Sequence, residues 1–253
     1  MKDINYKEIK LKVGLEIHQQ LATNHKLFCN CGINNLENDS NSIKFMRKFK
    51  PTQSELGQFD TAAIFEFHKN IISTYIADNS NSCLVESDEE PPHELNQEAL
   101  DIALTICLLL KSNIIDELHT MRKMVIDGSN TAGFQRTVII STDGELQHKN
   151  NKIPILAINL EEDAAKIIKK TGNKANYNLN RLGVPLIEIA LAPVETNPKE
   201  IEHIALSLGQ LLRSTGKVSR GIGTIRQDVN ISILNGPVIE IKGVQNGTQN
   251  GTK

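Results

Sequence analysis

The sequence predicts an α+β fold, in which a largely antiparallel sheet has packed helices on one side and a polar face on the other. Four segments alternate apolar and polar residues with a period of two, and two longer segments repeat apolar residues at helical spacing. Period-two alternation is typical of antiparallel strands with one buried and one wet face. With 253 residues, 39% of them hydrophobic, the chain is long enough to bury a sizeable core.

The composition argues against several classes of protein. A net charge of −2 does not mark the chain as a nucleic-acid binder, so any RNA contact needs a local patch or another segment. Trp is absent and aromatic residues make up only 4%, which disfavours base-stacking platforms. The N-terminus lacks an apolar signal segment, and the longest apolar stretch, 102–110, is too short to cross a bilayer. We therefore expect a cytoplasmic protein that does not contact a membrane.

The first predicted strand lies in IKLKVGLEIHQQL, residues 9–21. Alternation places Val13, Leu15 and Ile17 on the core side and turns Glu16 and His18 to the other face. Their Cα atoms are then about 6.5 Å apart, close enough for both side chains to reach one cation. Glu-x-His alone is a weak signal for a metal, and a merely solvated face is the alternative.

Loops and a first helix follow. The Asn-rich segment 34–42 and the Ser/Asn segment 79–82 predict loops. Asn96 is the expected N-cap of a helix that repeats apolar residues at helical spacing, namely Leu100, Ala103, Leu104, Cys107 and Leu108. The stretch DGSNTAGFQRT, 127–137, is rich in small residues and is either a turn or a ligand-binding loop.

Three consecutive acids, Glu161, Glu162 and Asp163, stand between an apolar run and a helix-like AAKIIKK segment. One interpretation places them in the first turn of a helix, where the helix dipole favours negative charge. The other ends a strand here and presents carboxylates to a hard cation such as Mg²⁺. A histidine ligand is less usual for Mg²⁺, so ligand type alone leaves Mn²⁺ and Zn²⁺ open.

The last third of the sequence combines strands with a second helix. Asn197 is its expected N-cap, Pro198 its first residue, and it ends before Gly216. The strand PLIEIAL sets Glu188 opposite isoleucines, and TIRQDVNISIL and VIEIKG also have one polar face each. The residues on those two faces are Thr224, Arg226, Asp228, Asn230, Ser232, Glu240 and Lys242. So many acidic, basic and amide groups indicate a working surface, although each strand alone is compatible with a solvated face.

Two further motifs are weak signals. RSTGKVSRGIGTIRQD supplies the cations Lys217, Arg220 and Arg226 beside flexible glycines and is a candidate phosphate site, although it matches no nucleotide-binding fingerprint. Cys29-x-Cys31 lacks a Cys-x-x-Cys partner. A zinc site needs two further ligands, so we interpret this pair as structural thiols.

Taken in order, these segments resemble one family. VGLEIHQQL, LFCNC, CLVESDEEPPHELN, MRKMVIDGSNTAGFQRT, LEEDAAK, RLGVPLIEIA, STGKVSRGIGTIRQDVNISI and VIEIKGVQ are similar to the E subunit of the archaeal glutamyl-tRNA(Gln) amidotransferase, a relative of the bacterial and organellar B subunit. The resemblance implies that residues 1–245 form the catalytic cradle domain of a ligase with glutamine as amido donor. Zinc-containing B-type members have an additional Cys-x-x-Cys motif, so the resemblance implies that this chain lacks that zinc.

The resemblance also implies a reaction that needs ATP and Mg²⁺. The γ-carboxyl of glutamate on mischarged Glu-tRNA(Gln) is phosphorylated, and ammonia from an amidohydrolase, the D subunit, then displaces the phosphate to give Gln-tRNA(Gln). A heterotetramer of two D and two E subunits is implied, with Glu-tRNA(Gln) held mainly by C-terminal domains. The alternative is a non-catalytic docking module for the D subunit, against which the intact acidic residues argue.

The polar residues are assigned to this reaction as follows. The expected catalytic residues are Glu16, His18, Glu162, Arg226 and Asp228. The expected metal ligands are Glu16, His18, Glu161, Glu162 and Asp228. The expected contacts to ATP or the acyl-phosphate are Arg220, Arg226, Asn230 and Lys242. Glu188 either has a structural role or orients the substrate.

Family members continue for several hundred residues beyond the motifs found here. We expect residues 246–253, NGTQNGTK, to be a disordered polar tail. The insertion, helical and tRNA-binding tail domains are expected to be absent. The chain is then a fragment, the product of a frameshift, or one part of a split subunit.

Overall fold

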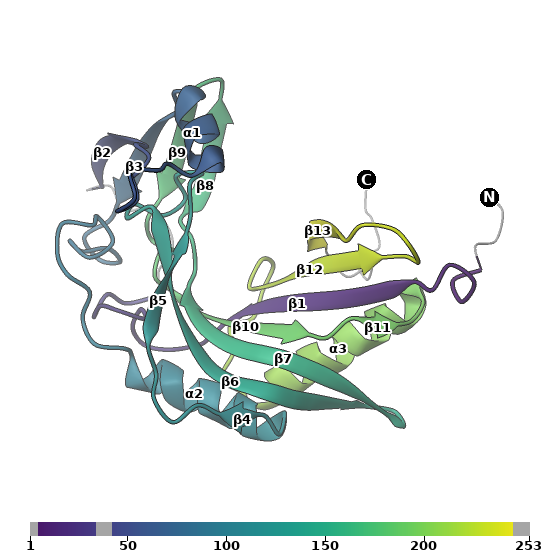
Figure 1. Ribbon diagram of the computed structural model, residues 1–253. Coiled ribbons are helices and arrows are strands. Elements are labelled where there is room, and N and C mark those ends of the chain that lie inside the picture. Colours follow the sequence, from purple (N-terminus) through teal and green to yellow (C-terminus); the bar gives the residue numbers. More distant parts are fainter. Residues whose placement is uncertain (1–4, 34–41, 245–253) are drawn as a thin grey trace, which may run out of the picture.

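The computed structural model describes residues 5–33 and 42–244 and confirms the α+β fold: two sheets and three helices occupy these ranges (Figure 1). The predicted tail 246–253 and most of the predicted loop 34–42 lie outside the described residues. Within the described ranges, none of the helices is long and apolar enough to cross a membrane.

The larger sheet has nine strands and is antiparallel throughout. Its main path runs β13 (Ile239–Val244), β12 (Ile225–Ser232), β1 (Lys12–Gln20), β10 (Pro185–Leu191), β7 (Asn151–Glu162), β6 (Phe134–His148) and β4 (Asn113–Ile114). Off this path, β11 (Val194–Glu195) pairs with β1, and β5 (Thr120–Met124) pairs with β6. The strand β1 therefore lies inside the sheet, between β12 and β10.

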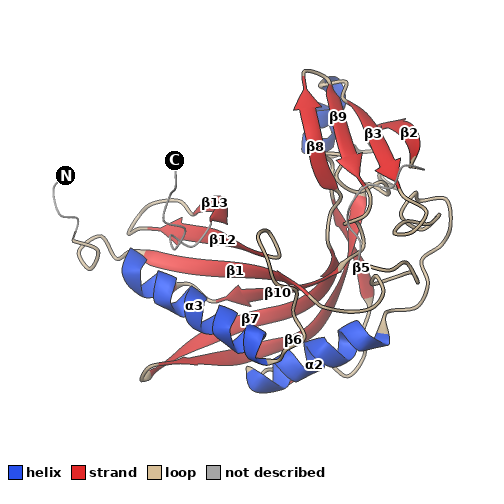
Figure 2. Ribbon diagram, turned by 180° about the vertical axis from the view of Figure 1, so that it is seen from behind, coloured by secondary structure: helices blue, strands red, loops and turns tan. Residues whose placement is uncertain are grey.

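Two predicted helices cover one face of this sheet (Figure 2). They are α2 (Gln97–Leu109) and α3 (Pro198–Ser214), and their N-caps are Asn96 and Asn197, as predicted. Their apolar faces join the main core together with Leu15 and Ile17 of β1. The alternation predicted for β1 is confirmed, because these two residues are buried while Glu16 and His18 are half-buried on the opposite face.

The N-cap of α3 stabilises the start of this helix. The side chain of Asn197 accepts a 3.0 Å hydrogen bond from the backbone N–H of Glu200. We expect Asn197→Ala to lower the free energy of unfolding by about 1 kcal/mol, because that N–H loses its partner. Urea denaturation measures the change. Gln210→Ala, at an exposed site on the same helix, is the matched control and should be neutral; equal losses in both variants would contradict the capping argument.

A smaller sheet stands apart from the first and was not predicted (Figure 1). Its order is β2 (Ile43–Lys48), β3 (Ile72–Ala77), β9 (Lys174–Asn178) and β8 (Lys166–Thr171), with α1 (Thr61–His68) beside it. Tyr75 and Tyr177 stack in its core with ring centroids 5.6 Å apart. The helical interpretation of AAKIIKK is wrong, because residues 166–171 pair with β9 as a strand.

The outer part of the large sheet is less covered than predicted. Ile225 on β12 is 43% exposed, and Ile239 and Ile241 on β13 are 60% and 45% exposed. Within the described residues, the helices bury the apolar side of β1 and β10 but leave much of the apolar side of β12 and β13 open.

Candidate functional site

Strand pairing brings the polar residues of separate strands into one row on the face opposite the helices. On one side of β1, Glu16 lies opposite Asp228 and His18 lies opposite Arg226 of β12. On the other side, His18 lies opposite Glu188 of β10. Paired residues in a sheet share a face, so the row crosses three neighbouring strands.

Glu188 is the centre of the hydrogen bonds and ion pairs that connect this row with neighbouring strands. The Nε2 atom of His18 is 3.0 Å from Oε2 of Glu188 and 3.8 Å from Oε1 of Glu161, which comes from β7. Asn159 donates from Nδ2 to Oε1 of Glu188 at 2.7 Å. Lys123 reaches in from β5 and places Nζ 3.2 Å from Glu188 and 3.7 Å from Glu161. We call Glu16, His18, Glu161, Glu188 and Asp228 the carboxylate–histidine cluster.

The charges and pKa shifts of the cluster favour a bound cation. Burial alone would raise the pKa of Glu188, but His18, Lys123 and Asn159 outweigh burial and lower it to about 2. Burial and the negative charge of Glu188 raise the pKa of Glu161. Burial opposes protonation of His18, yet the hydrogen bond to Glu188 and the nearby carboxylates raise its pKa overall. The basic groups of His18 and Lys123 both contact Glu188, so the cluster favours positive charge.

The donor atoms also suit a divalent ion. One ligand atom each from Glu16, His18 and Glu188 lie within 4.8 Å of one another, and so do those of Glu16, Asp228 and Glu240. Glu16 belongs to both groups and is therefore the geometric link between them. Carboxylate oxygens are the ligands that Mg²⁺ prefers, while the imidazole also suits transition metals.

The structure contradicts the expectation that Glu162 joins this cluster. Successive residues of a strand point to opposite faces, so Glu161 and Glu162 diverge. Glu162 is only 4% exposed and lies 3.1 Å from Nη1 of Arg136, which is 8% exposed. We therefore interpret Glu162 as half of a buried ion pair. The third acid, Asp163, accepts hydrogen bonds from Gln20 at 2.6 Å and from Arg226 at 2.7 Å.

The expected phosphate-binding residues are placed in two groups. Asn230 lies opposite Glu240 of β13, and Nζ of Lys242 is 3.1 Å from that carboxylate, so both lie beside the cluster. Arg220 instead lines a cavity of about 510 Å³ between α3 and the glycine-containing loop before β12. Arg226 lines this cavity too, and it belongs to the polar row of the sheet, where it lies opposite His18.

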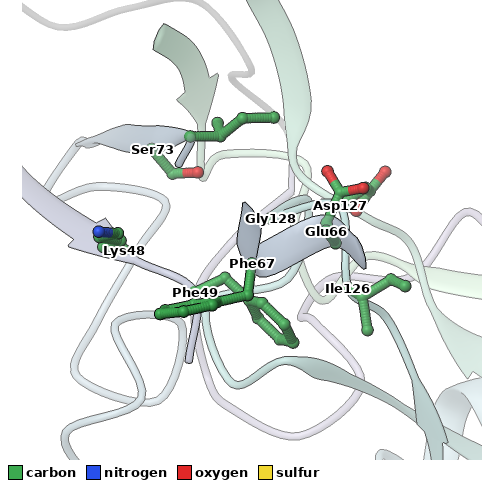
Figure 3. A pocket seen from close by; sticks show the side chains of 9 residues that line it. Lys48, Phe49, Glu66, Phe67, Ser73, Ile126, Asp127 and Gly128 are labelled. Carbon is green, nitrogen blue, oxygen red and sulfur yellow. The ribbon is translucent and has the colours of Figure 1, made fainter. Parts of the chain in front are cut away.

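A second, much smaller cavity of about 10 Å³ lies at the small sheet (Figure 3). The rings of Phe49 and Phe67 and the carboxylates of Glu66 and Asp127 surround it. That volume holds about one water molecule. Asp127 and Gly128 of the small-residue stretch 127–137 line it, but none of the residues assigned to the metal or to phosphate does, so it takes no part in the candidate site.

Sequence reasoning did not assign three contributors to the metal or to phosphate. Glu188 was recognised on the polar face, but its central position is set by register with β1 and β7. Lys123 gave no signal, because TMRKM has no apolar alternation and is exposed along its whole length. Glu240 showed alternation and was not assigned; only the pairing of β13 with β12 brings it to Asp228.

Comparisons with known proteins show what the chain is similar to. The model of the family described as GatB/GatE catalytic domain matches residues 11–250. Proteins named as the E subunit of glutamyl-tRNA(Gln) amidotransferase from Saccharolobus solfataricus, Sulfolobus acidocaldarius and Aeropyrum pernix are 56%, 54% and 52% identical to the chain over 245 residues. Each match covers 97% of this chain but 38% of the relative. The chain thus spans well under half the length of these relatives.

Proposed function

Because the chain belongs to the GatB/GatE catalytic domain family, we propose that it is the catalytic domain of a tRNA-dependent amidotransferase. The proposed reaction phosphorylates the γ-carboxyl of glutamate on Glu-tRNA(Gln) with ATP, after which ammonia displaces the phosphate to give Gln-tRNA(Gln). The observation that carries this proposal is the carboxylate–histidine cluster, assembled from four strands on the face that the helices leave free.

The cluster fits the needs of phosphoryl transfer, which depends on positioning and on neutralising the charge of the phosphates. Mg²⁺, when bound, supplies that neutralisation and orients the phosphates. Glu16, His18 and Asp228 are the proposed ligands. Glu188 holds the imidazole of His18 through their 3.0 Å contact. Glu161 adds a further carboxylate beside His18 and Lys123.

Cationic and amide groups around the cluster complete the proposed machinery. Arg226, fixed by Asp163, presents its guanidinium at the end of the row, where it can contact ATP phosphates. Asn230 and Lys242 flank the cluster on the β13 side. Lys123 brings a second positive charge to the place where the acyl-phosphate forms. Arg220 contacts phosphate only if ATP extends from the sheet toward the large cavity.

We also propose the partners of this reaction. Ammonia comes from an amidohydrolase, the D subunit, in a cytoplasmic heterotetramer of two D and two E subunits. Ammonia released into neutral water is mostly protonated to ammonium, which is not nucleophilic, so docking of the two kinds of subunit is part of the proposal. A purely docking role for this chain would leave the carboxylate–histidine cluster without a purpose.

The proposed function is tested with this domain joined to the C-terminal part found in its relatives. The assay contains Mg²⁺, ATP and Glu-tRNA(Gln), with ammonium chloride as an amino donor independent of the partner. We expect ADP formation that requires Glu-tRNA(Gln), followed by Gln-tRNA(Gln). Amidation without ATP consumption, or ATP consumption independent of the tRNA, would contradict the proposal.

The isolated chain is expected to bind Mg-ATP weakly and Glu-tRNA(Gln) poorly. Affinity for tRNA comes largely from many Lys and Arg contacts that release counterions. This chain has a net charge of −2, and its most basic stretch, residues 217–226, is assigned to the proposed site. Calorimetry with Mg-ATP and filter binding with Glu-tRNA(Gln) measure the two affinities. Specific sub-micromolar binding of Glu-tRNA(Gln) by residues 1–253 would contradict this prediction.

A further inference from the structure

The small sheet concentrates positive charge on one of its faces. Its four strands contain seven basic residues and no acidic residue, although the whole chain has a net charge of −2. Three rows of paired residues cross the sheet on one side: Lys44–Ile76–Asn178–Lys166, Met46–Thr74–Asn176–Lys169 and Lys48–Ile72–Lys174–Thr171. Lys48 turns toward the ring of Phe67 on α1. We call the other four lysines, Lys44, Lys166, Lys169 and Lys174, the lysine face.

Within the described residues, the lysine face is open to solvent, and all four of its lysines are exposed. The opposite face carries Tyr75 and Tyr177, whose hydroxyls donate to the backbone oxygens of Gly128 and Asp127. Residues of α1 line a small cavity on that same side, together with Ser73 (Figure 3). Figure 2 accordingly shows the small sheet in front of α1. The helix therefore leaves the lysine face uncovered.

The lysine face is complementary to a polyanion. In the described part of the chain its lysines form no ion pair, whereas Lys69, Lys111 and Lys242 each contact a glutamate. Thr74 and Asn176 lie in the same rows and add polar side chains that can bond to phosphate. Proteins that bind unpaired bases stack them on aromatic rings, but the aromatic residues of these strands lie on the opposite face. The face thus suits the phosphates of a duplex.

We propose that the lysine face binds the phosphate backbone of a duplex arm of the tRNA substrate. The inference rests on the proposed function, which supplies that substrate. Lys166 follows Glu161 of the carboxylate–histidine cluster by five residues, so their Cα atoms are at most about 18 Å apart. The unpaired 3′ end of a tRNA is a few nucleotides long, so at about 3.4 Å per nucleotide the duplex begins on the order of 15 Å from the amino acid. With the glutamate at the cluster, the duplex begins near the lysine face.

Four lysines provide a weak and salt-dependent affinity. Each phosphate contact contributes about 0.9 to the slope of log K against log salt concentration, and non-specific binding typically has a Kd of about 10⁻⁴–10⁻⁶ M. Lysine acts as a point charge and lacks the planar fork of arginine, so the contacts read charge and not sequence. The lysine face therefore orients the arm, in agreement with the poor binding of Glu-tRNA(Gln) expected for the isolated chain.

Fluorescence anisotropy tests the lysine face without any chemical step. The probe is a labelled RNA hairpin with the acceptor-arm sequence of tRNA(Gln), titrated with residues 1–253 at 50–200 mM salt, a range taken from the usual conditions of such measurements. The triple variant Lys166→Gln/Lys169→Gln/Lys174→Gln should bind at least about 10-fold more weakly and lower the salt slope by about 3. The matched control, Lys111→Gln/Lys149→Gln/Lys152→Gln, removes the same charge from exposed lysines outside the small sheet and should change neither quantity.

Each outcome decides between the lysine face and its alternatives. Equal losses in the two triple variants would overturn the proposal, because only net charge would then matter. Tighter binding to single-stranded RNA of equal length would overturn the duplex, and tighter binding to anionic lipid vesicles would overturn RNA as the ligand. Circular dichroism checks each fold, and Lys169→Gln alone should lower the slope by about 1 if the triple variant does not fold.

Kinetics of the domain joined to the C-terminal part of its relatives separate this proposal from the proposed function. The triple variant of the lysine face should raise KM for Glu-tRNA(Gln) at least about 10-fold and leave kcat unchanged, because the lysines touch none of the reacting atoms. Normal amidation with an unchanged KM would overturn the lysine face alone. Lysine-dependent binding of the hairpin by a protein without amidotransferase activity would overturn the proposed function alone.

Discussion

Replacing Glu16 with Gln is expected to slow ATP-dependent phosphorylation of Glu-tRNA(Gln) by about 10²-fold or more. Glu16 is the residue shared by the two groups of candidate ligands, so its charge bears on the whole cluster. Gln keeps the size of the side chain but loses the negative charge that would hold the ion. Asp228→Asn, directly opposite on β12, is expected to have an effect of the same size. Release of ADP in single-turnover reactions measures the step.

Controls separate this effect from damage to the fold. Glu195→Gln is a matched charge removal at an exposed position of β11, away from the cluster, and should leave the rate unchanged. Both cluster variants should still copurify with the D subunit, because neither residue contributes to the core. If Glu16→Gln and Asp228→Asn turn over ATP at nearly the normal rate, the metal assignment is wrong.

Replacing Glu162 with Ala is expected to reduce the free energy of unfolding by about 3–5 kcal/mol. The variant leaves Arg136 with an uncompensated charge in a site where it is only 8% exposed. Glu162 also accepts the backbone N–H of Arg136 at 3.2 Å, and that donor loses its partner too. Urea denaturation followed by circular dichroism gives the difference in stability.

A comparison with the cluster makes the assignment of Glu162 testable. Glu16→Gln removes one of several neighbouring carboxylates, so it should leave the stability unchanged or slightly higher. Replacing Arg136 and Glu162 together by apolar residues of similar size should recover most of the stability lost in Glu162→Ala. A Glu162→Ala variant that is as stable as wild type but defective in phosphorylation would return Glu162 to the catalytic group.

The strands of the candidate site were the part of the fold that the sequence predicted best. Alternation with period two depends only on which face of a sheet is buried, so it assigned Glu16, His18 and Asp228 to one face correctly. The caps Asn96 and Asn197 were predicted equally well, because an N-cap interaction spans only three residues.

Features that depend on distant pairing were not predictable in the same way. Three acids in a row carry no alternation, and only the end of β7 decides that Glu161 and Glu162 point apart. Ala and Lys favour helices, but pairing with β9 overrides that preference in residues 166–171. Glu86 joins Cys29 only through the packing of two loops that are far apart in the sequence.

The position of β1 between β10 and β12 also has a consequence for the order of events during synthesis. Glu16 emerges from the ribosome early, but its partner Asp228 follows only after about 10–40 s at the usual rate of 5–20 residues per second. Throughout that interval one edge of β1 has no neighbour, and such an edge is open to pairing with other chains. The nascent protein can therefore pair wrongly with other chains until β12 has been made. Glu16 and Asp228 first come together at the same moment.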